Sequence, residues 1–184
     1  MRSNHLMPKA ALLAAGLAAL ALAAPAGAAT YRLSGKQIAV DENAGKFKMA
    51  GSLVGNWNVT KFDTLATSPL LQGKGAEVFN GCLDVRRNGC DRRDPKGTLT
   101  FGFTYEALFA SPDPSSLVWG SCRHPIVSGT GGFARAKGVI AMVDTPTRSG
   151  VRTDYIGNIT LPGNARTKRG ARARAATATT GGCG

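Results

Sequence analysis

Apolar and polar residues alternate along the middle of this chain. The longest run spans residues 98–110, where the odd positions are mostly aromatic and the even positions include three threonines and Glu106. Successive side chains of a strand point to opposite faces, whereas a helix would scatter these rings around its circumference. The run therefore predicts a strand with one buried face, made of Leu99, Phe101, Phe103, Tyr105 and Phe109.

Shorter runs with the same period predict further strands. Residues 139–143 are apolar at both parities, which indicates burial on both faces. Turn signals separate the runs, and no segment shows a sustained helical period. The other expected strands are 53–60, 155–161, Tyr31–Leu33, Gln37–Val40, Phe47–Ala50, Glu77–Asn80 and Leu117–Ser121.

About seven to nine strands in residues 29–163 predict an all-β domain, either an antiparallel sandwich or a closed barrel. We favour a small closed antiparallel barrel, because closure leaves no exposed edge strand. A coiled coil, a helical bundle and a large multidomain enzyme are excluded by the composition.

Both ends of the chain differ from this middle part. Arg2 and Lys9 precede an Ala- and Leu-rich run over residues 10–24, and Ala26-Gly27-Ala28 fits a cleavage site. We interpret residues 1–28 as a signal peptide, since the apolar run is short of the ~20 residues of a membrane span. The expected product is secreted, with bacterial export through the general secretory route. Residues 164–184 contain no residue that could anchor a core, so we expect a disordered tail.

The charge of the chain is unevenly divided. The formal charge is +12, but two basic residues lie in the leader and five in residues 164–184. Residues 29–163 hold 16 Lys and Arg against 11 Asp and Glu. Because no aromatic residues are interleaved with the basic clusters, we expect no specific nucleic-acid partner. The basic tail could instead contact an anionic cell-envelope polymer.

A glycine-rich segment carries a family resemblance. Residues 126–144 read IVSGTGGFARAKGVIAMVD, which resembles the hairpin signature of the allene oxide cyclase and dirigent superfamily, in particular its uncharacterised secreted bacterial branch. The resemblance implies an eight-stranded barrel with a central cavity, often assembled as dimers or trimers. The matching residues are Ser128, Gly129, Thr130, Gly131, Phe133, Ala136 and Gly138.

The same residues have a structural interpretation. Gly129, Gly131 and Gly138 permit positive φ or close backbone approach, and Phe133 is expected to plug one end of the barrel. The segment holds no acid, base or nucleophile, so the resemblance carries no activity with it. It is not a dinucleotide-binding fingerprint either, because a strand rather than a helix follows it.

Four cysteines suggest disulfides in an exported chain. Our first choice is Cys82–Cys90, which would close a compact polar loop; pairing of either residue with Cys122 stays open. Cys183 lies in the tail and is either free or paired with the remaining cysteine. A zinc site that also includes His124 is disfavoured, because the spacing matches no usual motif.

The loop after Cys82 resembles the start of a calcium-binding loop. Asp84 and Asn88 occupy ligand positions and Asp91 offers a further carboxylate, but Arg86 and Pro95 stand where ligands are needed. We expect a turn-rich loop with internal Arg–Asp pairs rather than a metal site, and no cofactor.

Candidate catalytic residues are few. Glu106 lies opposite the aromatic face and is the best candidate for a carboxylate that reaches a lumen, although a solvent-facing strand residue is the simpler interpretation; Asp144 is a second acid. His124 could act as a general base, although it lies in a predicted bend and a structural or surface role is the simpler interpretation. No nucleophile elbow or metalloprotease motif is present.

These observations favour a secreted, non-catalytic β-barrel that binds a small apolar ligand or a protein partner. The expected ligand-binding residues are Trp57, Phe101, Phe103 and Tyr105. A cyclase- or isomerase-like enzyme acting in the cavity is the alternative, and a structural or cell-surface interaction protein is a third.

Overall fold

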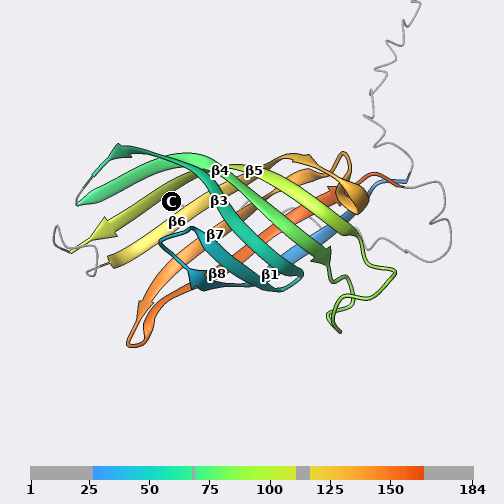
Figure 1. The fold of residues 1–184 in the computed structure, drawn as a ribbon, viewed down its shortest axis with the longest axis horizontal. Coiled ribbons are helices and arrows are strands. Elements are labelled where there is room, and N and C mark those ends of the chain that lie inside the picture. Colours follow the sequence, from blue (N-terminus) through green and yellow to red (C-terminus); the bar gives the residue numbers. More distant parts are fainter. Residues whose placement is uncertain (1–26, 68, 111–116, 164–184) are drawn as a thin grey trace, which may run out of the picture.

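Eight antiparallel strands close into a barrel in the computed structural model, which describes residues 27–67, 69–110 and 117–163 (Figure 1). Each strand pairs with the next along the chain, and the last pairs with the first. The all-β closed barrel is thus confirmed, and the sandwich is excluded. The strands are β1 (Ala29–Asp41), β2 (Lys46–Gly51), β3 (Leu53–Ala66), β4 (Leu70–Leu83), β5 (Lys96–Phe109), β6 (Leu117–Gly129), β7 (Lys137–Thr147) and β8 (Gly150–Leu161).

The predicted leader and basic tail lie almost entirely outside these described residues, so their roles stay predictions. Within the described ranges, no helix has the length and apolar character needed to cross a membrane.

Alternation of side chains decides what fills the barrel. On β5, Leu99 and Phe101 are fully buried and Phe103 is nearly so, while Thr104 and Glu106 on the other parity are exposed. The predicted aromatic face is therefore confirmed as the inner face of the barrel.

The prediction for residues 139–143 was wrong on one face. Ile140 and Met142 are buried inside the barrel, but Val143 is 40% exposed on the outer face. Val139 and Ala141 on that outer face are only partly buried, so only the inward parity of β7 is fully buried.

Two inward-facing glycines on β4 make room for aromatic rings. A Cβ on Gly75 would lie 2.6 Å from the ring of Phe103, and one on Gly81 would lie 2.6 Å from the ring of Phe79. Real Cβ atoms do not approach rings so closely, so only glycine leaves space for the two rings. Small and large residues therefore alternate inside the lumen.

One end of the barrel is closed by packed side chains. The short 3-10 helix η2 (Gly131–Phe133) in the β6–β7 connection turns at Gly131, whose φ is +58°. Phe133 is fully buried and packs edge-on against Phe79, with ring centroids 6.2 Å apart. In Figure 1 the η2 turn and the loop after β4 lie at this same end, opposite the tip of the β7–β8 hairpin. The expected role of Phe133 as a plug fits this position.

The loop after β4 also belongs to the closed end. Its disulfide joins Cys82 to Cys90, which confirms our first choice of pairing. Arg87 donates hydrogen bonds to the hydroxyl oxygens of Ser34 (2.6 Å) and Ser52 (3.2 Å), which ties the loop to the barrel. The opposite end has no comparable cover among the described residues, and the candidate site lies there.

Candidate functional site

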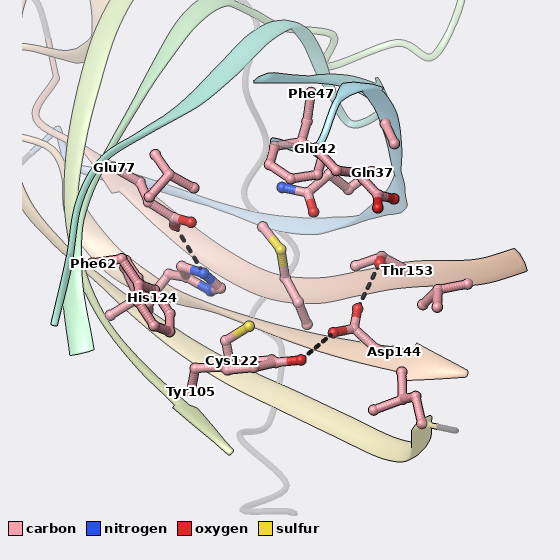
Figure 2. A pocket seen from close by; sticks show the side chains of 16 residues that line it. Gln37, Glu42, Phe47, Phe62, Glu77, Tyr105, Cys122, His124, Asp144 and Thr153 are labelled. Carbon is pink, nitrogen blue, oxygen red and sulfur yellow. Dashed lines mark hydrogen bonds and ion pairs between the residues drawn. The ribbon is translucent and has the colours of Figure 1, made fainter. Parts of the chain in front are cut away.

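A cavity of about 300 Å³ occupies the lumen at the open end of the barrel (Figure 2). Every one of the eight strands contributes to its wall. Its volume lies at the lower limit of typical small-molecule sites. The cavity is lined by Gln37, Ala39, Glu42, Phe47, Val59, Phe62, Glu77, Phe103, Tyr105, Leu117, Cys122, His124, Met142, Asp144, Val151 and Thr153.

The four expected ligand-binding aromatics separate into two layers. Phe103 and Tyr105 line the cavity. Trp57 and Phe101 do not: they are fully buried one layer closer to the closed end, stacked with ring centroids 4.6 Å apart. Only two of the four therefore line this cavity, because alternation along a strand gives the face but not the depth.

A buried acid–imidazole pair lies between the two layers. His124 Nε2 lies 2.9 Å from Glu77 Oε2, and the two side chains are 1% and 8% exposed (Figure 2). The ring of Trp57 packs edge-on against the imidazole, with ring centroids 5.5 Å apart, and the ring centroid of Phe103 lies 5.8 Å from that of the imidazole. The pair is thus held inside an aromatic shell at the inner end of the cavity.

The hydrogen bonding of this pair is incomplete. Glu77 Oε2 has no well-aligned hydrogen-bond donor despite its short contact with His124 Nε2. His124 Nδ1 has no protein partner, and neither has Nε1 of the buried Trp57. Buried polar groups are almost always paired, so unpaired ones beside a cavity point to a ligand or water as the missing partner.

The predicted bend at His124 was wrong. His124 lies within β6, and the β5–β6 pairing skips His124 and Pro125, where proline has no N–H to donate. The interruption explains how a proline fits into the strand.

Glu77 was missed by the sequence reasoning. It faces the lumen because it pairs with Phe101 and shares the parity of Phe79 on β4. That parity was the available signal, but a four-residue run was too short to show it.

A second polar cluster lies on the opposite wall. Asp144 accepts hydrogen bonds from Thr153 Oγ1 at 2.5 Å and, more weakly, from Tyr105 Oη at 3.4 Å (Figure 2). Burial, and then the negative charge of Asp144, raise the pKa of Tyr105 well above its ordinary value. Tyr105 therefore stays protonated and donates to the carboxylate. The structure places Asp144 in the cavity wall, as a lumen acid requires.

Glu106 does not reach the lumen, so the lumen candidate is wrong and the solvent-facing interpretation is confirmed. The side chain is exposed on the outer face of β5, where it accepts a hydrogen bond of 3.1 Å from Gln72 Nε2. Since Tyr105 and Ala107 point inward, the intervening residue must point outward.

Cys122 lines the cavity as a thiol. It forms no disulfide with the described cysteines, so the alternative pairings with Cys82 or Cys90 are wrong. The oxidation of Cys82 and Cys90 also removes the zinc alternative. Burial raises the pKa of Cys122, and the charges of Asp144 and Glu77 raise it further. The thiol is therefore a poor nucleophile at neutral pH.

In the 84–95 loop, the carboxylates are used by the loop itself. Asp84 accepts backbone hydrogen bonds from Asn88 (3.2 Å) and Gly89 (2.7 Å), and Asp91 forms an ion pair of 3.6 Å with Arg86. The backbone N–H of Arg93 lowers the pKa of Asp91. The loop is thus turn-rich with an internal Arg–Asp pair, as expected. In the described part of the chain, no three His, Cys, Asp or Glu side chains lie close enough together to hold a metal ion.

A scan of protein-family models and searches of curated proteins and of solved structures found no match to this chain. The family resemblance of residues 126–144 therefore stays a prediction, while the eight-stranded barrel that it implied is confirmed.

Proposed function

We propose that this protein is an exported barrel that binds a small, largely apolar molecule in the open end of its lumen. The observation that carries the proposal is the contrast between the two ends. The closed end is filled by side chains such as Phe133, whereas the open end leaves a cavity of about 300 Å³ with aromatic walls. Barrels of this size either pack their lumen or hold one small ligand there.

The entrance supports the same function. Phe62 and Val151 both line the cavity and are 45% and 51% exposed, so the opening has an apolar rim. An apolar ligand would bury rim and wall together, which is favourable by about 25 cal/mol per Å².

Export is part of the proposal. The Cys82–Cys90 disulfide is compatible with an oxidising compartment, as the predicted signal peptide requires.

A cavity-filling variant tests the binding function. Val59 lines the cavity, and Val59→Trp should abolish binding of a neutral fluorescent apolar probe, N-phenyl-1-naphthylamine. The matched control is Val127→Trp, since Val127 is 68% exposed on the outer surface. If the wild-type protein fails to bind the probe, or if both variants bind it equally, the proposed function is wrong.

A second candidate function is acid–base catalysis, of the cyclase or isomerase type. The Glu77–His124 pair favours it, because a carboxylate can orient an imidazole that moves a proton on a bound substrate. Such a protein should exchange protons next to the carbonyl group of small ketones into D₂O, and His124→Gln should abolish the exchange. Equal exchange by the wild-type protein and this variant would exclude the catalytic alternative.

A further inference from the structure

The charges that line the cavity have one sign. Three carboxylates, those of Glu42, Glu77 and Asp144, line it, and among the described residues no Lys or Arg does. The surrounding domain has the opposite bias, with 16 basic residues against 11 acidic ones in residues 29–163. The cavity is therefore an acidic site inside a basic barrel.

The carboxylates come from different walls. Glu42 lies in the β1–β2 turn, Glu77 on β4 and Asp144 on β7, and Figure 2 shows them on separate sides of the cavity. In the described residues, no three His, Cys, Asp or Glu side chains lie close enough together to coordinate a metal ion. A larger ion that fills the space between the walls suits this arrangement.

The walls between the carboxylates are aromatic. Rings of Phe47, Phe62, Phe103 and Tyr105 line the cavity. Aromatic faces attract organic cations, and the attraction is stronger where the site is desolvated.

An independent observation points to a missing partner. His124 is 1% exposed and lines the cavity, and its Nδ1 has no protein hydrogen-bond partner. Because His124 already contacts Glu77, the carboxylates of Asp144 and Glu42 are the ones left to face a bound cation.

We propose that the cavity binds an organic ammonium ion with an apolar body. The inference rests on the proposed binding function and names its ligand class. Asp144 and Glu42 supply the opposite charge, and the rings of Phe103 and Tyr105 contact the alkyl groups around the nitrogen. Where the ion carries an N–H, that group can donate to His124 Nδ1.

Three probes of one shape test the charge preference. Benzyltrimethylammonium is a cation, neopentylbenzene is its neutral isostere, and phenylmethanesulfonate is an anion with the same ring. Titration of the full chain, followed by NMR or calorimetry, should show that the cation binds at least about 10-fold more tightly than the neutral probe. The anion should bind more weakly than either.

The assignment of the carboxylates is tested by isosteric variants. Asp144→Asn and Glu42→Gln should each weaken binding of the cation, the former by about 10-fold, and leave binding of neopentylbenzene unchanged. Glu106→Gln is the control, because Glu106 lies on the outer face and should leave the affinity for the cation unchanged. Thermal unfolding of each variant shows whether it is folded.

The outcomes separate the two proposals. Equal affinity for the cation and its neutral isostere, or an Asp144→Asn variant that binds the cation as well as the wild-type protein, overturns the ammonium assignment and leaves the binding function standing. Failure of the folded wild-type protein to bind any of these probes or the naphthylamine overturns both.

Discussion

At the scale of single residues, the burial of Glu77 depends on His124. A carboxylate that is 8% exposed has lost most of its hydration, and the adjacent imidazole is the group that offsets this loss. Around both lie aromatic rings, which could equally well pack against an apolar side chain. The pair is therefore an arrangement that stability alone does not require, which fits a role in binding or proton transfer.

Changes at this pair should be strongly non-additive. His124→Phe fills the same space but leaves Glu77 buried without its partner, so we expect a loss of about 2–3 kcal/mol in the free energy of unfolding. Adding Glu77→Met should restore most of that loss, because the pair is then replaced by apolar groups. Urea unfolding of both single variants and the double variant measures the coupling free energy between the two residues. If the losses of the single variants simply add in the double variant, the burial of Glu77 does not depend on His124.

Cys122 predicts a loss of stability at alkaline pH. Its pKa in the folded chain is raised by burial above the ordinary thiol value of 9.0, so the unfolded chain loses this proton first. The stabilisation is complete below about pH 9 and is lost as pH rises, with a slope approaching 1.4 kcal/mol per pH unit. Unfolding free energies of the wild-type protein and Cys122→Ala between pH 8 and 11 should diverge in slope, and parallel curves would refute the effect.

At the scale of the strands, the packing of β4 depends on a glycine, which has no side chain. A Cβ on Gly75 would clash with the backbone carbonyl oxygen of Lys61 on β3 and with the ring of Phe103. The clash would fall beside a register shift between Val59 and Lys61. Here the backbones of β3 and β4 must lie close together for the lumen to accommodate the ring.

Two glycine substitutions on paired strands should therefore differ sharply. Gly75→Ala should cost about 2–3 kcal/mol of unfolding free energy, since backbone as well as side chain must move. Gly102→Ala, on the outer face of β5, should change it by less than about 0.5 kcal/mol, because its new Cβ would meet only Val127 at 3.8 Å and a carbonyl oxygen at 3.9 Å. Similar losses for the two variants would mean that the clash is relieved elsewhere.

At the scale of the whole molecule, the barrel could be predicted but its cavity could not. Alternation on β5 gave the lumen face correctly, and the disulfide followed from the short loop between Cys82 and Cys90. Parity also limits Glu106 to the outer face, once the aromatics are known to fill the lumen. A cavity is a different quantity, because it is the volume left after eight inward faces have packed, and no single strand contains it. For the same reason, the contact of Glu77 on β4 with His124 on β6 could not be predicted from the local pattern of either strand.

The two ends of the barrel should also differ in local stability. Fully buried residues such as Leu53, Leu99 and Ile159 belong to the packed core, whereas the strands around the cavity bury fewer apolar contacts. Local opening should therefore start at the open end, so backbone amides near Leu108 and Val151 should exchange at least about 10-fold faster than those near Leu99 and Ile159. Native-state hydrogen exchange measures both sets in one experiment, and saturating benzyltrimethylammonium should slow exchange at the open end only. Uniform exchange would show that the cavity does not weaken the strands around it.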